Sequence, residues 1–409
     1  MVYLFPILLT LLLIYHYDYR GHKEGRIIWY IFLLVYCISV AGLRYRIGGD
    51  TVVYMLNHYD RLPDLSGYWS YDFTNEKFGR GYVFLNAIAR SISDNFVVMQ
   101  IILAVILNSV VFRFFYKNTP HIFTAVLFYM LLAYLNLNTE VLRESMAIAC
   151  LLLGWEFFYR HKWWQYYLIC AVAFFFHPSS AFMMILPVFT LKFFHKAFSF
   201  SWLSVGLAFG LYFLGIVLTS KFFDLIRLIG IATMDSYADM YEGSGITDAK
   251  NFNIVGNLLD ILSLIVYPLI VCWIISKRRG NGEDNGKEEE GYKGGLVLMI
   301  LTYAYVGAMS SSMIILYRFN NYLVLFFILG AADALFSAIR LFKHRVKFSY
   351  TLWMVFIFPV LYVPVNRLYR PSGRSQTAFI HRYYPYYSVI NPELDSEREK
   401  INYFYQQTR

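Results

Sequence analysis

Apolar residues form long runs along this chain, and short polar segments separate them. A helix needs roughly 20 apolar residues to cross the hydrocarbon core of a bilayer, and runs of about 17 are also found. The pattern therefore predicts an all-α fold, a polytopic transmembrane helical bundle with about 12 spans. The predicted spans are 2–17, 27–43, 96–116, 121–137, 141–159, 164–177, 178–191, 200–219, 254–276, 295–312, 316–335 and 349–364.

Lysine and arginine gather in every second loop between these spans, as Lys23, Lys117, Arg160, Lys192, Arg278 and Lys343 illustrate. Cytoplasmic loops of membrane proteins carry such an excess. We therefore predict that these loops are cytoplasmic and that both termini lie outside. The run 2–17 lacks a basic n-region and a small-residue cleavage site, so we interpret it as the first span and not as a cleaved signal peptide.

Two segments fit this topology less simply. The stretch 76–93 is fairly apolar, but counting it as a crossing would invert every later loop. We predict an amphipathic or re-entrant segment on the outer face. The tail that follows Asn366 is basic, with Arg367, Arg370, Arg374 and Arg382, and is still placed outside.

The only stretch of low complexity is 280–294, which is rich in glycine and mixed charge and indicates a solvated cytoplasmic linker. It divides the predicted bundle into an N-terminal membrane block, 1–279, and a C-terminal block, 295–364. The first block carries the outer loops 44–95 and 220–252, and an extracytoplasmic tail, 365–409, follows the second.

Composition agrees with a membrane protein. Of the 409 residues 58% are hydrophobic and only 15% are charged, where soluble domains average about 25%. The net charge of +9 lies in short loops and not on a polar helix face, so we predict no nucleic-acid partner. All four cysteines fall within apolar runs, and we expect no metal site and no cofactor.

Ionisable residues are costly inside a bilayer, so those beside the predicted spans need an explanation. Several fall at the outer ends of the spans: Arg44, Arg46, Asp50, Tyr54, Glu140, Arg143, Glu144, His177, Tyr317 and Arg318. Structural roles are open for each of them, such as anchoring of a span end by Arg44 or Arg46 and helix capping by Asp50. Their convergence on one side nevertheless indicates a binding or catalytic site.

The chemistry of these side chains suits a phosphorylated ligand. Arginine binds phosphate oxygens through two parallel hydrogen bonds and keeps its charge when partly buried. A carboxylate such as Asp50, or a histidine such as His177, is able to take a proton from a sugar hydroxyl. The residues alone leave open which of the two would act as the base.

At these positions the chain resembles the EpsG/Wzy-type family of membrane polysaccharide polymerases. The matching segments are 44–51 (RYRIGGDT) with Tyr54, Glu76 ahead of 81–86 (GYVFLN), 142–147 (LRESMA), 176–181 (FHPSSA), Tyr317-Arg318 and 384–386 (YPY). A typical member has Arg-Gln in place of Arg143-Glu144, and Gly-Thr-Asp in place of Gly49-Asp50.

The resemblance implies a glycosyltransferase of the bacterial cytoplasmic membrane. It would join repeat units carried on undecaprenyl diphosphate into a capsular polysaccharide, exopolysaccharide or O-antigen chain on the outer side. The implied partners are the lipid-linked oligosaccharide, the growing polysaccharide, membrane lipid and a chain-length regulator.

On this basis the predicted catalytic residues are Asp50, His177 and Arg143, and the predicted substrate-binding residues are Arg44, Arg46, Tyr54, Glu144, Tyr317 and Arg318. Two rival functions are a flippase or transporter of lipid-linked sugars and a ligase that uses the same carrier. Transporters usually place charges near the midplane and contain internal repeats, neither of which this sequence indicates. A membrane acyltransferase is disfavoured because His177 is predicted on the outer side.

Overall fold

A computed structural model describes residues 2–74, 76, 78–218, 254–277, 286–311, 313, 316–341 and 379–407. Within these residues the regular structure is helical, and no strand is formed apart from two isolated bridges in unit 1. The chain forms two compact units, which we describe separately. Unit 1 comprises Met1–Met184 and Val360–Arg409, and unit 2 comprises Ile185–Pro359.

Unit 1 contains the first part of the chain and its C-terminal tail. Its helices are α1 (Leu4–Leu13), α2 (Arg26–Gly42), α3 (Gly49–Asn57), α4 (Arg80–Ile92), α5 (Val97–Asn118), α6 (Ile122–Leu132), α7 (Tyr134–Thr139), α8 (Leu142–Tyr159), α9 (Trp163–Phe176), α10 (Ala181–Ile185, at the border with unit 2) and α19 (Ser396–Gln407). A π-helical turn at Ile14–Tyr19 extends α1. The helix pairs α2–α5, α5–α8 and α8–α9 pack against each other and form the centre of the unit.

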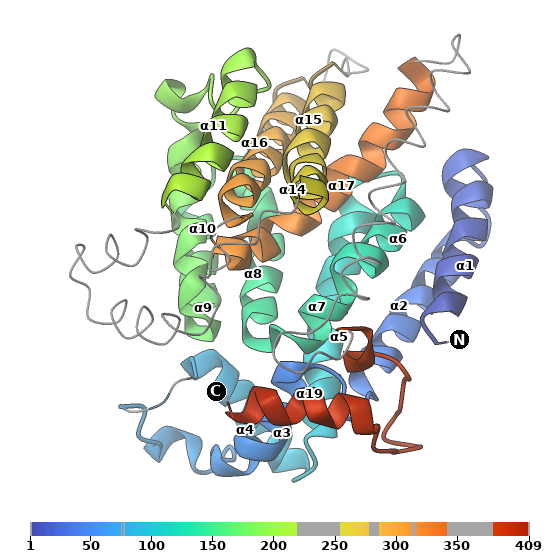
Figure 1. Cartoon of the computed structure of the whole chain (residues 1–409), viewed down its shortest axis with the longest axis vertical. Helices are drawn as coiled ribbons and strands as arrows, with labels where there is room; N and C mark the ends of the chain where they lie inside the picture. Colours follow the sequence, from blue (N-terminus) through green and yellow to red (C-terminus); the bar gives the residue numbers. More distant parts are fainter. Residues whose placement is uncertain are drawn as a thin grey trace. The chain divides into compact units, whose positions relative to one another are not determined.

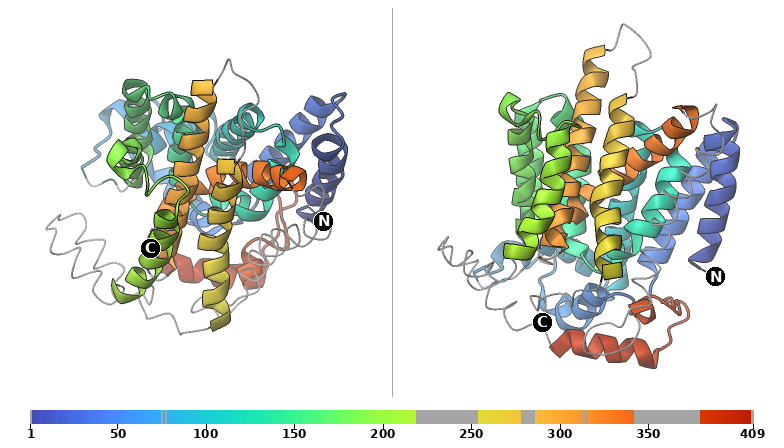
Figure 2. Two further views of the ribbon diagram at one scale, coloured as in Figure 1. Left: turned by 90° about the horizontal axis from the view of Figure 1, so that it is seen from above. Right: turned by 45° about the horizontal axis from the view of Figure 1, so that its top comes forward.

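Unit 2 is built from longer apolar helices. They are α11 (Trp202–Leu218), α14 (Ile254–Ile261), α15 (Tyr267–Lys277), α16 (Gly286–Ser310) and α17 (Tyr317–Leu341). A π-helical turn at Leu262–Val266 joins α14 to α15. Helix α16 packs against α11, α15 and α17, and Figure 2 shows α15 and α16 side by side. The predicted polar linker 280–294 thus has a helical second part, which begins at Gly286 and continues into α16.

Four helices are long and apolar enough to cross a membrane: Val97–Asn118, Asn257–Lys277, Glu289–Ser310 and Tyr317–Ala338. They match four predicted spans. Six further predicted spans correspond to shorter apolar helices, Leu4–Tyr19, Arg26–Gly42, Ile122–Leu132, Trp163–Phe176, Pro178–Thr190 and Trp202–Leu218. The prediction of a helical membrane protein is confirmed, whereas the count of 12 spans stays a prediction.

Two spans differ in detail from the continuous helices that we predicted. The helix expected over 121–137 breaks at Ala133, between α6 and α7. The segment 178–191 forms a 3₁₀ turn, the short helix α10 and a second 3₁₀ turn, Leu186–Thr190. Proline explains the second case, because Pro178 and Pro187 lack the backbone N–H that a continuous α-helix needs. The predicted span 349–364 and outer loop 220–252 lie outside the described residues.

The ambiguous stretch 76–93 contains α4, a helix of 13 residues. At about 1.5 Å per residue it is roughly 20 Å long, shorter than a hydrocarbon core of about 30 Å. Helix α4 is also not among the apolar helices of the described residues, because Arg80, Asn86 and Arg90 interrupt its apolar residues. These properties agree with the predicted amphipathic segment.

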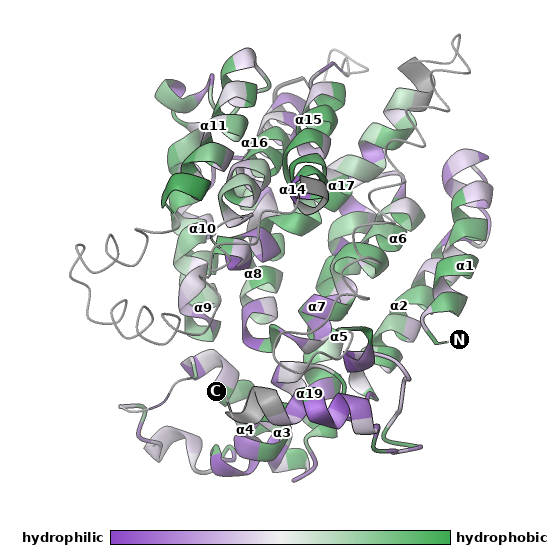
Figure 3. Ribbon diagram, in the orientation of Figure 1, coloured by the Kyte–Doolittle hydropathy of each residue, from purple (hydrophilic) through white to green (hydrophobic). Residues whose placement is uncertain are grey.

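The C-terminal tail packs against the start of the chain. Helix α19 contacts α3, and Figure 1 shows it running across α3 and α4. Figure 3 shows that the α19 segment is among the most hydrophilic of unit 1. At the other terminus the Tyr3 hydroxyl donates to the Tyr383 carbonyl at 3.2 Å. Both termini of unit 1 therefore lie at one end of it, as the predicted topology requires; the assignment of that end to the outside stays a prediction.

Candidate functional site

The buried side chain of Arg44 stabilises the loop between α2 and α3 through hydrogen bonds to both of its ends. This side chain is 2% exposed, and its Nε and Nη2 atoms donate to the Thr51 hydroxyl at 3.2 and 2.8 Å. A further hydrogen bond reaches the Ala41 carbonyl. Burial is the main cause that lowers the pKa of Arg44, to about 10. These contacts favour the anchoring role over ligand binding for Arg44.

Gly48 allows the loop to approach α7 closely. Its φ is +94°, and a Cβ atom at this position would lie 2.4 Å from Cβ of Thr139. Glycine alone combines this backbone angle with such contact at little cost. The residues that follow form α3, with Asp50 in its first turn, where a negative charge is favourable to the helix dipole.

Glu140 joins this loop to the C-terminal tail. Its carboxylate accepts hydrogen bonds from the Gly49 N–H at 3.2 Å and the Tyr383 hydroxyl at 3.0 Å, and it lies 3.1 Å from Nη1 of Arg382. The side chains of Glu140 and Arg382 are 12% and 4% exposed. We call Gly49, Glu140, Arg382 and Tyr383 the Glu140 cluster.

A buried hydrogen-bond network fixes the helix that precedes Glu140. The Asn108 amide donates to the Asn138 side-chain oxygen at 2.8 Å, and the Asn138 amide donates to the Tyr129 hydroxyl at 3.0 Å. Tyr129 in turn donates to the Asn108 oxygen at 2.9 Å. Because buried polar groups that satisfy one another specify a single arrangement, α5, α6 and α7 hold Glu140 at a defined position.

A second ion pair connects the tail to the same loop. Nε of Arg46 donates to Oε1 of Glu399 at 2.9 Å, and Nη2 donates to Oε2, which makes the contact bidentate. The hydrogen bond that Arg46 donates to Glu399 raises the pKa of Arg46. Burial acts to raise the pKa of Glu399, but the hydrogen bond and charge of Arg46 outweigh it and lower that pKa. Arg46 thus binds the tail of its own chain.

Arg143 lies in a setting of aromatic side chains. Its Nε donates to the Tyr54 hydroxyl at 2.8 Å, and its guanidinium carbon lies 4.7 Å from the centre of the Phe78 ring. The Tyr54 ring packs against Phe78 and Tyr82, at 5.2 and 5.5 Å between ring centres. Asp50 is buried and attracts the Arg143 guanidinium electrostatically. We call Asp50, Tyr54, Phe78, Tyr82 and Arg143 the Arg143 cluster.

His177 lies at the tip between α9 and the 3₁₀ turn Pro178–Ser180. Its Nδ1 atom accepts from the Ser179 N–H at 3.2 Å and lies 2.6 Å from the Ser179 hydroxyl. The imidazole therefore caps the turn, and with Nδ1 as an acceptor the neutral ring carries its proton on Nε2. The same tip reaches the Arg143 cluster through Gly79, where a Cβ would lie 2.3 Å from the Phe175 carbonyl oxygen.

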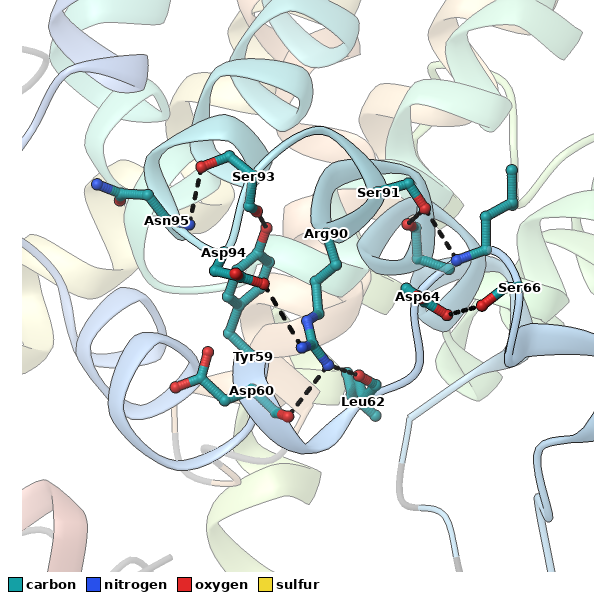
Figure 4. A network of polar contacts seen from close by, with 12 residues as sticks. Tyr59, Asp60, Leu62, Asp64, Ser66, Arg90, Ser91, Ser93, Asp94 and Asn95 are labelled. Carbon is teal, nitrogen blue, oxygen red and sulfur yellow. Dashed lines mark hydrogen bonds and ion pairs between the residues drawn. The ribbon is translucent and has the colours of Figure 1, made fainter.

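A polar network fixes the other end of α4 (Figure 4). Arg90 donates to the carbonyls of Asp60, at 3.1 Å, and of Leu62, and it lies 3.7 Å from the Asp94 carboxylate. Tyr59 donates to the Ser93 carbonyl at 2.8 Å. The segment after α3 is thereby attached to α4, which places Phe78 and Tyr82 opposite Tyr54.

Unit 1 thus brings together three predicted site residues, Asp50, Tyr54 and Arg143, and it also contains His177 and Glu144. Glu144 is 3% exposed in the first turn of α8, directly after Arg143. Tyr317 and Arg318 begin α17 in unit 2, where Tyr317 is 37% exposed. The predicted roles of these residues stay predictions.

Sequence reasoning did not select three residues that the structure places beside the loop: Arg382, Tyr383 and Glu399. Their partners are 242, 243 and 353 positions away along the chain. The available signal was the position of Glu140 between two predicted spans, since an acid there needs a cation to offset the cost of its burial.

The described helices, four of them able to span a membrane, and the charged residues collected at one end of unit 1 define the class: a helical membrane protein with a polar site at the ends of its helices. Residues 27–388 match the model of the EpsG family, and the chain belongs to this family, a Wzy-like polymerase family. No curated protein and no solved structure matches the chain.

Proposed function

We propose that this protein polymerises lipid-diphosphate-linked oligosaccharide repeat units, with undecaprenyl diphosphate as the carrier, on the outer side of the bacterial cytoplasmic membrane. Family membership supports a polymerase of polysaccharides. The carrier, the side of the membrane and the assignment to capsule, exopolysaccharide or O-antigen are parts of the proposal.

The observation that carries the proposal is the Arg143 cluster. A guanidinium that is oriented by a phenol hydroxyl and a ring face is pre-organised to bind the oxygens of a diphosphate. The carboxylate of Asp50 belongs to the same cluster. A cation that stabilises the leaving diphosphate and a base that takes the proton of the acceptor hydroxyl would both speed glycosyl transfer from a lipid diphosphate.

The proposed reaction transfers a glycosyl group from the lipid diphosphate to a sugar hydroxyl. A hydroxyl of the acceptor sugar loses its proton to the base, and its oxygen forms a bond to the anomeric carbon of the donor. The bond from that carbon to the diphosphate oxygen breaks, and the electron pair stays on the leaving lipid diphosphate. Arg143 stabilises the charge that develops there. We assign the base to Asp50, with His177 as the alternative, because Nδ1 of His177 already accepts a hydrogen bond from Ser179.

The test measures polymer length in cells that lack the protein. They are complemented with wild type, Arg143→Ala, Asp50→Ala, His177→Ala or Arg318→Ala, and membrane levels of each variant are measured. We expect Arg143→Ala and Asp50→Ala to leave single lipid-linked repeats on the outer face. Arg20→Ala serves as the control, because Arg20 is an exposed residue after α1 that bonds only to Tyr15 among the contacts described.

Other outcomes separate the rival functions. Repeats trapped on the cytoplasmic face would show a flippase, and a normal ladder that is not passed to its final acceptor would show a ligase. A normal, correctly attached ladder from all four variants at wild-type membrane levels would refute the proposed site.

A further inference from the structure

A cavity of about 310 Å³ lies between α5 and α8, near their C-terminal ends. Arg143 is in the first turn of α8, whereas the cavity is lined by residues between Leu152 and the C-cap residue Arg160 of that helix. Because α8 has 18 residues, the cavity lies near the opposite end, which is roughly 25 Å away at about 1.5 Å per residue. The loop charges predict that this end is cytoplasmic.

The lining of the cavity changes in polarity along both helices. Val110 of α5 and Leu152 and Leu153 of α8 lie nearer the middle of the helices. Leu153 is 44% exposed, so the apolar part reaches the surface of unit 1. The charged lining residues follow toward the helix ends. A phospholipid has the same order, with its acyl chains toward the bilayer centre and its phosphate at the interface.

Three basic side chains line the polar part: Arg113 and Lys117 of α5, and Arg160 directly after α8. Arg113 and Lys117 are four residues apart, so they share one face of α5. Glu156 lies 3.4 Å from Arg160 and offsets one of the three charges. The formal charge of the lining is therefore +2, which favours an anion.

The walls of the cavity are fixed by hydrogen bonds. Trp155, which is 1% exposed, donates from Nε1 to the Asn118 side-chain oxygen at 3.2 Å and so connects α8 to the end of α5. The Asn118 amide donates to the Phe114 carbonyl at 2.7 Å. These two bonds connect the ends of α5 and α8 on one side of the cavity.

We propose that this cavity binds one anionic phospholipid of the cytoplasmic leaflet. Its phosphate contacts Arg113, Lys117 and Arg160, and one acyl chain lies along Val110, Leu152 and Leu153. Basic pockets between transmembrane helices on the cytoplasmic side bind anionic headgroups in this way. The orientation of the chain in the membrane would explain the positive charge on this side but does not require a cavity. Here an apolar wall continues from the basic residues, and a bound lipid explains both features.

The test uses the full-length protein, purified in a neutral detergent, and native mass spectrometry. Phosphatidylglycerol and phosphatidylcholine with identical acyl chains are added in equal amounts. Each basic residue near an anionic headgroup changes affinity by about fivefold. We expect wild type to retain phosphatidylglycerol at least about tenfold better, and the Arg113→Gln/Lys117→Gln variant to lose this preference.

The matched control is Arg20→Gln/Lys23→Gln, which also removes two positive charges, from exposed positions on the side predicted to be cytoplasmic and outside the cavity. It should keep the wild-type preference. Equal retention of both lipids by wild type would overturn the proposal, as would an unchanged preference in the double variant. Displacement of the lipid by millimolar inorganic phosphate would also overturn it, because the ligand would then be a soluble phosphate; failure of phosphate to compete supports the lipid. Equal melting temperatures of the variants without lipid verify that they fold.

Discussion

The Glu140 cluster and the Arg143 cluster lie at the same end of unit 1. Each contains an arginine that the predicted topology assigns to the outer side of the membrane. Their environments differ. Arg382 forms an ion pair with Glu140, and both side chains are almost fully buried. Arg143 donates to a tyrosine hydroxyl, lies over an aromatic ring and is attracted by the charge of Asp50, and its exposure is intermediate. The first arrangement fastens two distant parts of the chain, and the second presents an oriented cation.

Because their environments differ, mutations in the two clusters should have different effects. Removing a partner from a buried ion pair leaves an uncompensated charge and destabilises the fold. Removing the Arg143 guanidinium removes the group proposed to bind the diphosphate, and it also leaves the buried Asp50 carboxylate without this cation. Loss of Glu140 should therefore lower the stability, whereas loss of Arg143 should lower polymerisation per protein molecule in addition to any change in stability.

The largest effect is expected from Glu140→Ala. It leaves Arg382 buried without its carboxylate, and such losses cost about 3–5 kcal/mol. Unfolding of the purified protein by denaturant in detergent measures the change. Glu156→Ala is the control, since Glu156 forms an exposed i,i+4 pair worth about 0.5 kcal/mol or less. Addition of Arg382→Met should restore part of the loss, and a Glu140→Ala protein as stable as wild type would contradict the role of this cluster.

The second effect is expected from Arg143→Ala. Removal of one group that stabilises developing charge typically lowers a rate by about 10²–10³-fold. Polymer formation in isolated membranes, normalised to the amount of protein, measures it. Arg143→Lys keeps the charge but loses the planar fork, so it should restore only part of the rate. A decrease that follows protein level alone would place Arg143 with the structural residues.

Gly48→Ala should have an intermediate effect. Its left-handed φ and its contact with Thr139 both oppose a side chain, and strain of this kind costs about 1–3 kcal/mol. Gly67→Ala is the matched control, because Gly67 has an ordinary φ and its nearest atoms would lie 3.4 Å from the new Cβ. The melting temperatures of the two variants give the comparison. Equal values would show that the loop does not need to approach α7.

The smallest effect concerns the pH dependence of the tail. The folded pKa of Glu399 is lowered, so its pair with Arg46 contributes fully above the unfolded pKa of about 4.3 and is lost as pH falls through the folded pKa. The contribution is about 1 kcal/mol or less. Proteolysis of the tail should therefore accelerate at acidic pH in wild type. The tail of the Glu399→Gln variant should be cleaved faster than that of wild type at neutral pH, with little further change in rate on acidification. The control is Glu397→Gln, which removes an exposed pair with Lys400 and should behave like wild type.

Much of the helical framework could be predicted because apolar periodicity is a local property of the sequence. The break at Ala133 could not, because no proline or glycine marks it. The candidate residues Asp50, Tyr54 and Arg143 were also predictable, since charged and polar groups beside an apolar run need a reason to be there. The partners Arg382 and Glu399 were not, because they pair over 242 and 353 positions of the chain, and a single sequence contains no signal for contacts at that distance.

The docking of the tail has a consequence for biogenesis. The loop 44–51 leaves the ribosome early, but its contacts with 379–407 cannot form until the last part of the chain has been synthesised. The site loop therefore matures only after translation is complete. A chain released prematurely would carry Arg46 without Glu399 and Glu140 without Arg382, so this end of unit 1 assembles only once synthesis is complete.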